Sequence, residues 1–261
     1  MLINNRRAGL VFDLIECLVQ RCFSYATGDV RKAYVLIKAA LLRRDCEKVV
    51  LILHSQGGIE GGLIMDWLLD ELPRDILQKL EVYTFGNAAN HFNNPRHRRD
   101  GESESSQTSN SNTCIERSVG YIEHYANSGD VVSWLGVLHF VGFPNRYMGR
   151  LFVRQGTGHM MNHHYLHNMF TLGPDNKVLE SNPFMDLEVE VTSTIPANET
   201  RDSQASSTGN GEKTLLPLAG PEQQMTNGDS GGTELQVLRI KDFSRLWQYR
   251  NGGSPERYKT E

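Results

Sequence analysis

The chain has 261 residues, of which 39% are apolar, and a formal net charge of −4 at pH 7. This length allows one substantial core or two small ones. The mild charge gives no reason to expect nucleic acid as a partner, and no apolar run is long enough to cross a bilayer.

The N-terminus and the cysteines bear on the cellular compartment. Residues 1–7 lack the apolar run and small-residue cleavage site of a signal peptide. The four cysteines have no metal-ligand spacing and no resemblance to a dense disulfide framework. A cytoplasmic location is therefore favoured, on the condition that the sequence starts at the true N-terminus of the protein.

The first predicted elements are two amphipathic helices and a buried strand. Apolar residues recur at helical spacing over residues 10–22, and again over residues 30–41 after a turn at residues 27–29. Residues 49–53 form a continuous apolar run, which is typical of a strand buried on both faces. A helical pattern resumes over residues 59–68.

Three further strands are predicted, over residues 80–85, 119–125 and 150–154, and helical patterns separate some of them. Alternation of strands and helices favours a parallel sheet with helices on its faces. The fold class expected is therefore α/β, with a mostly parallel sheet and flanking helices.

The domain organisation expected is one α/β domain over residues 1–191. Residues 96–117 and residues 192–233 are rich in small polar residues. They cannot bury enough apolar surface to offset the entropy lost on ordering, so both are predicted to be disordered. Within residues 234–261 an amphipathic pattern between Leu235 and Tyr249 predicts a helix that packs back on the domain, followed by a tail.

Ser55 lies between the first predicted strand and the helix that follows it. A strand–serine–helix turn is the context of a nucleophile elbow, which exposes the serine hydroxyl at the carboxyl edge of a sheet. The backbone N–H of Gln56 would then donate to a developing oxyanion. Leu53 stands where the usual Gly-x-Ser-x-Gly pattern has its first glycine, and the alternative is a serine that only caps the helix.

Asp130 and His159 are the candidate acid and base. Asp130 follows the third predicted strand, and His159 follows the fourth in a glycine-rich loop. Since carboxyl ends of parallel strands meet at one edge, both would lie near Ser55. The order Ser, Asp, His is that of α/β-hydrolases. The alternatives are a helix N-cap at Asp130, a role that can coexist with that of the acid, and an ordinary loop histidine at His159.

A cluster of histidines follows the same loop. His159, His163 and His167 are four residues apart, so on one continuous helix they would share a face and suggest a transition-metal site. No acidic or cysteine ligand lies close by, and Gly158 indicates that His159 precedes the helix. No metal ion and no cofactor is therefore expected, and metal binding is the weaker alternative. His54 either lines the pocket or ends its strand, and the second is favoured.

Several segments together resemble a fungal group of lipase-like serine esterases in the α/β-hydrolase superfamily. They are VLILHSQGG at residues 50–58, YTFGNAANHF at 83–92, HYANSGD at 124–130 and GHMMNHHY at 158–165. The resemblance covers most of the chain outside the two polar segments. It implies that Ser55, Asp130 and His159 form a catalytic triad and that an ester or acyl lipid is the substrate.

The resemblance also exposes a gap at the N-terminus. In this superfamily strands precede the first helix, and the loop after the third strand supplies a second oxyanion donor. The chain offers no candidate for that loop. We therefore expect missing N-terminal strands, a bare edge beside the strand of Ser55, and a truncated form of a longer enzyme. Two functions stay open: a serine hydrolase, or a catalytically impaired binding or scaffold protein of the same fold.

Overall fold

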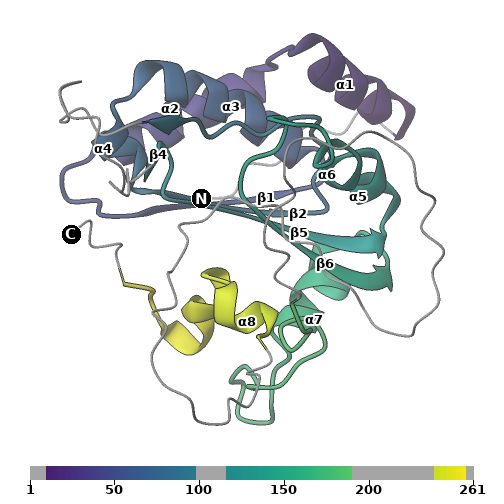
Figure 1. Ribbon diagram of the computed structural model, residues 1–261. Coiled ribbons are helices and arrows are strands. Elements are labelled where there is room, and N and C mark those ends of the chain that lie inside the picture. Colours follow the sequence, from purple (N-terminus) through teal and green to yellow (C-terminus); the bar gives the residue numbers. More distant parts are fainter. Residues whose placement is uncertain (1–9, 98–115, 190–237, 257–261) are drawn as a thin grey trace, which may run out of the picture.

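The computed structural model describes residues 10–97, 116–189 and 238–256. A four-stranded parallel sheet with helices on both faces forms the centre of these residues, which confirms the predicted α/β fold (Figure 1). The order of its strands is β1-β2-β5-β6. Their bounds are β1 Val49–His54, β2 Leu80–Phe85, β5 Tyr121–Gly129 and β6 Arg150–Thr157.

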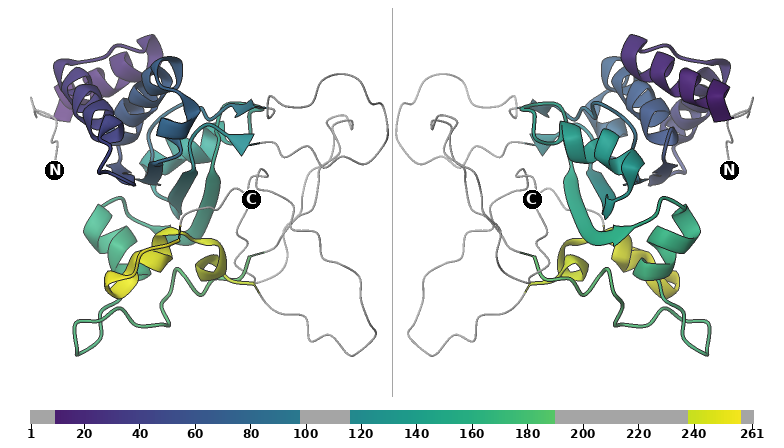
Figure 2. Two further views of the ribbon diagram at one scale, coloured as in Figure 1. Left: turned by 90° about the vertical axis from the view of Figure 1, so that its left-hand side faces the viewer. Right: turned by 90° about the vertical axis from the view of Figure 1, so that its right-hand side faces the viewer.

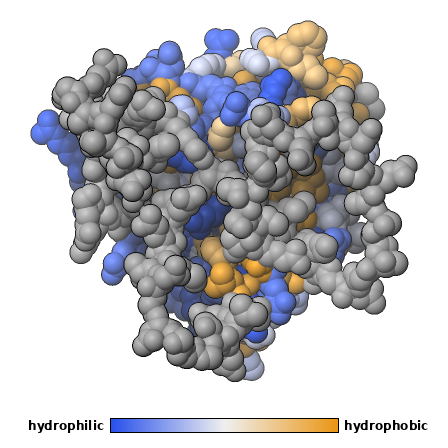
Figure 3. Space-filling view, viewed as in Figure 1, coloured by the Kyte–Doolittle hydropathy of each residue, from blue (hydrophilic) through white to orange (hydrophobic). Residues whose placement is uncertain are grey.

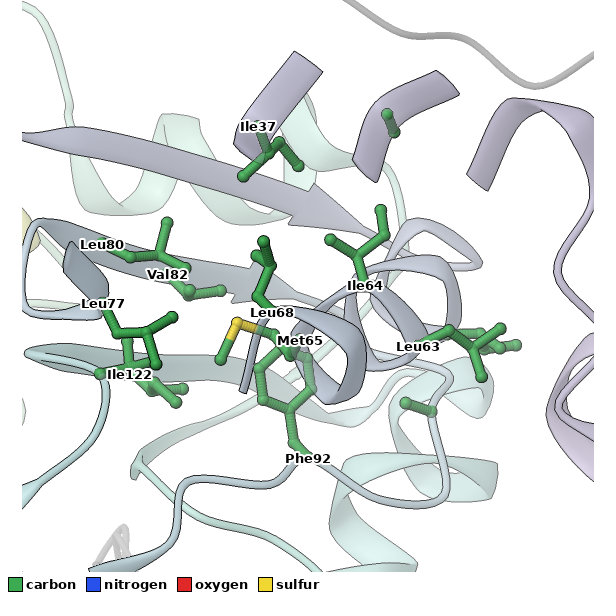
Figure 4. Packing of buried hydrophobic residues seen from close by; sticks show 14 of the residues in the cluster. Ile37, Leu63, Ile64, Met65, Leu68, Leu77, Leu80, Val82, Phe92 and Ile122 are labelled. Carbon is green, nitrogen blue, oxygen red and sulfur yellow. The ribbon is translucent and has the colours of Figure 1, made fainter. Parts of the chain in front are cut away.

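Four helices lie on one side of the sheet (Figures 1 and 2). They are α1 Leu10–Phe23, α2 Gly28–Leu42, α3 Gly57–Glu71 and the short α4 Arg74–Leu77. The apolar stripe predicted for residues 30–41 faces inward, because Ile37 and its helical neighbours are buried. Figure 4 shows Ile37 packed with Leu68 of α3 and Val82 of β2 in the main core.

The opposite side of the sheet carries short elements (Figure 1). They are η1 Met161–Leu166, α7 His167–Met169, α8 Ile240–Phe243 and η2 Leu246–Gly252. A second buried cluster there is rich in aromatic side chains, among them Tyr83, Phe85, Tyr125, Phe152, Tyr165 and Trp247. Two more short helices, α5 Val131–Leu135 and α6 Val137–Phe140, follow β5, and Val137 of α6 is buried in the main core on the side of α2 and α3. None of the helices described is long and apolar enough to cross a membrane.

The first predicted disordered segment has structured ends. β3 Arg96–His97 pairs antiparallel with β4 Glu116–Arg117. The segment predicted over residues 96–117 is therefore too long at both ends, because its terminal residues form a short ladder. Its remainder lies outside the described residues, as does the second predicted segment over residues 192–233.

β1 differs from the predicted strand buried on both faces. Val50 and Ile52 are 40% and 52% exposed, whereas Leu51 and Leu53 pack against the main core. Alternate side chains of a strand point to opposite faces, and the aromatic cluster on the second face covers β2, β5 and β6. β1 is also the edge strand, and it has no partner on its outer edge among the described residues.

α1 presents its apolar stripe outward, although the pattern over residues 10–22 is typical of a face that packs on a core. Leu14, Ile15 and Leu18 are at least half exposed, and Gln20 is fully buried instead. In Figure 3 hydrophobic surface gathers at the upper right, where Figure 1 places α1. A part-buried hydrogen bond from Gln56 Nε2 to Gln20 Oε1 joins the polar face of α1 to the start of α3.

The C-terminal segment, residues 238–256, forms two short helices where one amphipathic helix is predicted. Ile240 of α8 and Trp247 of η2 are buried in the aromatic cluster. The chain breaks between these helices because the backbone N–H groups of Arg245 and Leu246 donate to the side chain of Glu123 on β5. The predicted start at Leu235 lies outside the described residues.

Candidate active site

Ser55 occupies the turn between β1 and α3 in a left-handed backbone conformation, with φ of +58°. Its N–H donates to Phe85 O at 3.1 Å, and its carbonyl oxygen accepts from Gly58 N and Ala88 N. A serine rarely adopts this conformation unless its surroundings hold it there. The turn therefore has the strained left-handed geometry that the predicted nucleophile elbow requires at the carboxyl edge of the sheet.

Glycines of α3 make room for this turn. A Cβ atom at Gly58 would lie 1.9 Å from Asn87 Oδ1, and one at Gly61 would lie 2.2 Å from Leu53 Cδ1. Leu53 is the residue that departs from the usual nucleophile-elbow pattern. Gly61 accommodates its side chain, so the strand and the helix still approach closely.

Gln56 is the residue immediately before α3. Within the described residues no acceptor takes its backbone N–H. Its side chain turns toward α1, where Nε2 donates to Gln20 Oε1 at 2.9 Å. Since a helix N-terminus carries partial positive charge, the Gln56 N–H is suited to stabilise an oxyanion that forms on a carbonyl near Ser55.

Asp130 follows β5 and is 1% exposed. Its Oδ1 accepts from Val132 N at 2.9 Å and so caps α5. Its Oδ2 accepts from His159 Nδ1 at 2.8 Å, from Tyr165 Oη at 2.6 Å and from Ser133 Oγ at 3.1 Å. Helix capping and contact with the histidine therefore coexist in Asp130, as the sequence allows.

The hydrogen bonds decide the charge of Asp130. Burial by itself would raise the pKa of this carboxyl group, but the bonds from His159 and Tyr165 outweigh burial and lower the pKa below its ordinary value. Burial, followed by the bond to Asp130, raises the pKa of Tyr165. An ionised carboxylate therefore faces a tyrosine that keeps its proton and donates it.

His159 follows β6 and lies half-exposed beside the buried Asp130. Because a carboxylate accepts, the proton of a neutral His159 sits on Nδ1, and Nε2 is free to act as a base. Gly86, with φ of +55°, lies against this pair, and a Cβ atom there would approach Asp130 Oδ2 and the His159 ring to 2.9 Å. Only glycine leaves room for the Asp130–His159 pair here.

The structure thus brings Asp130 and His159 into direct contact, with Ser55 on the same edge of the sheet. Among the described residues Ser55 Oγ makes no hydrogen bond with His159. Proton transfer would need the two side chains to approach, and such bonds are often long before a substrate binds.

Sequence reasoning missed two partners of the acid–base pair. Tyr165 is fully buried and donates to Asp130. It lies in η1, a π-helix, and short π-helices are frequent at functional sites. The hydrophobic period gives no signal for such a turn. His54 ends β1 as expected, yet its ring also stacks on His159 at a centroid distance of 4.6 Å.

The histidine cluster does not gather around a common point. His159 precedes η1, and His164 Nδ1 accepts from Met160 N at 2.9 Å. His163 is exposed. Within the described ranges no group of three or more histidine, cysteine or acidic side chains is arranged to hold a metal ion.

Comparison of the chain with protein-family models, with curated proteins and with solved structures gives no match. The functional argument therefore rests on the geometry around Ser55, Asp130 and His159.

Proposed function

We propose that the chain is a serine hydrolase that cleaves carboxylic esters or acyl lipids, with Ser55 as nucleophile, His159 as base and Asp130 as acid. One observation carries the proposal. Ser55 has the elbow conformation at the end of β1, and the Asp130–His159 pair follows two other strands of the same parallel sheet. Three residues far apart in sequence supply the parts of a triad at one edge.

The proposed reaction proceeds through an acyl-enzyme. Ser55 Oγ attacks the ester carbonyl carbon while His159 Nε2 takes the hydroxyl proton. His159 then returns that proton to the leaving alcohol as the C–O bond breaks, and a water molecule releases the acid by the same steps. Asp130 stays ionised and orients His159. The Gln56 N–H donates to the oxyanion, a contact whose loss typically costs about 10²–10³ in turnover.

A fluorophosphonate probe tests the proposal, because it forms a stable adduct only with an activated serine. We expect one adduct per wild-type chain, located on Ser55, and none in Ser55→Ala. Ser24→Ala is the matched control. Ser24 is also a serine with positive φ, +52°, but it is exposed and lies outside this site. This variant should react like wild type, whereas an unlabelled wild-type chain with a normal circular dichroism spectrum would contradict the proposal.

A second candidate is a non-catalytic protein of the same architecture that serves as a binding or scaffold module. It is favoured by the oxyanion geometry, since Gln56 offers the one backbone donor that we identify beside Ser55 in the described part of the chain. Hydrolases of the α/β-hydrolase superfamily, which the chain resembles, use two such donors. The scaffold candidate predicts a folded wild-type protein on which Ser55 does not react with the probe.

A further inference from the structure

We propose that His54 is a positioning residue that fixes the base loop, residues 158–160, relative to the strand that carries Ser55. The proposal rests on the proposed function, since it concerns the same triad. His54 directly precedes Ser55 in the chain, so any bond between His54 and the base loop joins the nucleophile and the base with few intervening atoms.

Two contacts join His54 to the base loop. His54 Nε2 lies 2.7 Å from the backbone oxygen of His159. Because a carbonyl oxygen only accepts, Nε2 carries the proton and donates it. The two imidazole rings also stack, with an interplanar angle of 29°. His54 therefore holds both the backbone and the ring of His159.

The base loop needs such contacts because Gly158 gives it conformational freedom. Gly158 has a φ of +95°, which few other residues adopt. Asn127 Nδ2 donates to Gly158 O at 3.1 Å, and Met160 N donates to His164 Nδ1 at 2.9 Å. These two contacts come from β5 and η1. Three side chains thus bond to the two successive peptide groups of the loop, and among them only His54 comes from the strand of the nucleophile.

The charge state of His54 suits this role. Burial lowers the pKa of His54, and the nearby His159 also lowers it, while the bond to His159 O and the charge of Asp130 act in the opposite direction. A neutral His54 does not oppose the positive charge that His159 gains when it takes the proton of Ser55. The charged and titratable groups that act on His54 are His159 and Asp130.

Two substitutions separate the hydrogen bond from the ring. His54→Gln keeps an N–H donor of similar reach, whereas His54→Phe keeps a flat ring without a donor. We expect His54→Phe to slow fluorophosphonate labelling of Ser55 by about tenfold, which is the effect of one lost hydrogen bond on a rate. His54→Gln should restore the rate to within about threefold of wild type.

His124 provides a matched control. It is also a buried histidine on a strand, and its Nε2 lies 3.1 Å from the backbone oxygen of Met148, away from the triad. His124→Phe should lower the melting temperature without changing the labelling rate of the folded protein. If His124→Phe and His54→Phe slowed labelling equally, the slower labelling would be a general effect of a disturbed core. The positioning role of His54 would then be wrong.

A proton NMR measurement tests the same role without turnover. The His159 Nδ1 proton bonded to Asp130 should give a downfield resonance that is sharp in wild type and His54→Gln but broadened in His54→Phe. If this pattern appears while wild-type Ser55 does not react, the positioning role stands and the proposed hydrolase function fails. An unchanged resonance together with an unchanged labelling rate in His54→Phe overturns the positioning role. If His54→Phe does not fold, His54→Asn, whose amide is too short to reach His159 O, replaces it.

Discussion

Asp130 and Glu123 are two carboxylates of the same part of the chain, each 1% exposed, and each accepts a hydrogen bond from a buried tyrosine. Their remaining partners differ. Glu123 accepts from the backbone N–H groups of Arg245 and Leu246, so the C-terminal segment encloses it. Asp130 instead accepts from His159, whose side chain is 30% exposed.

Glu81, on the adjacent strand β2, belongs to the same enclosed region because Arg245 of the C-terminal segment also contacts it. Glu81 Oε1 lies 2.8 Å from Arg245 Nε, and its Oε2 accepts from Tyr83 and Tyr249. Glu81 and Arg245 are both buried. We call Glu81, Glu123 and Arg245 the carboxylate–arginine cluster. It joins β2 and β5 to the C-terminal segment, which is remote from them in sequence.

The pKa values of Glu123 and Asp130 shift in opposite directions. Burial raises the pKa of Glu123, because its several hydrogen bonds do not fully offset the loss of water. The bonds from His159 and Tyr165 outweigh burial at Asp130 and lower its pKa. Two carboxylates with similar burial therefore have different roles. A carboxylate whose partners are all enclosed joins segments of the fold, and one that orients a partly exposed histidine can support chemistry.

Among the variants that test the different roles of Asp130 and Glu123, we expect the largest change in labelling rate for Asp130→Asn. Asparagine still caps α5, so the fold should persist, but His159 loses the partner that fixes its tautomer. We expect fluorophosphonate labelling of Ser55 to slow by about 10³–10⁴-fold, measured as a second-order rate constant. Asp242→Asn, which changes another helix-capping aspartate outside the site, should label at the wild-type rate. Wild-type labelling of Asp130→Asn would remove Asp130 from the triad.

Arg245→Ala should have the opposite profile, a large loss of stability with little change in labelling per folded molecule. It leaves Glu81 as a buried charge, and breaking such a pair costs about 3–5 kcal/mol. Lys48 Nζ lies 3.7 Å from Glu81 Oε1 and still partly balances the charge of Glu81 in the variant. We therefore expect a loss of stability near the lower end of this range. Urea unfolding measures the change.

Arg250→Ala is the control for Arg245→Ala. Arg250 comes from the same segment, but its partner Glu180 is 71% exposed. Its removal should cost no more than about 1 kcal/mol. If the two arginine variants were equally stable, the carboxylate–arginine cluster would not be what holds the C-terminal segment.

Glu60 on α3 is a further largely buried carboxylate, but not all of its oxygen atoms have a hydrogen-bond partner. Its Oε1 is buried and has no hydrogen-bond partner among the described residues. Burial, with Glu16 and Asp29 nearby, raises the pKa of Glu60 from 4.5 to about 7, although a bond from Gln20 lowers it. The folded protein therefore holds this proton over a pH range in which the unfolded chain has released it.

This shift fixes the sign of the pH dependence. The contribution of Glu60 to stability is fully present below pH 4.5 and is lost as the pH rises through about 7. Glu60→Gln removes that loss, so at pH 8 it should raise the free energy of unfolding by about 2–3 kcal/mol relative to wild type. Near pH 4 the two proteins should be equally stable. A difference of the same size at both pH values would show that ionisation of Glu60 is not the cause.

Local patterns of residues were enough to predict several elements of the fold. The apolar stripe of α2, the continuous run of β1 and the glycines after Ser55 predict a strand–turn–helix unit, because each pattern reflects the geometry of a few neighbouring residues. The order of Ser55, Asp130 and His159 after successive strands adds their common edge, since the carboxyl ends of parallel strands meet there.

The partners of individual side chains, in contrast, depend on how the elements pack in three dimensions. The outward apolar face of α1, the fit of Leu53 against Gly61, the bond from Tyr165 to Asp130 and the contact of His54 with His159 all join different elements. The spacing of apolar residues identifies which face of a helix is apolar, but it does not identify the element against which the helix packs. Hydrogen bonds between distant segments depend on how the elements pack, and so they leave no mark in the local pattern of residues.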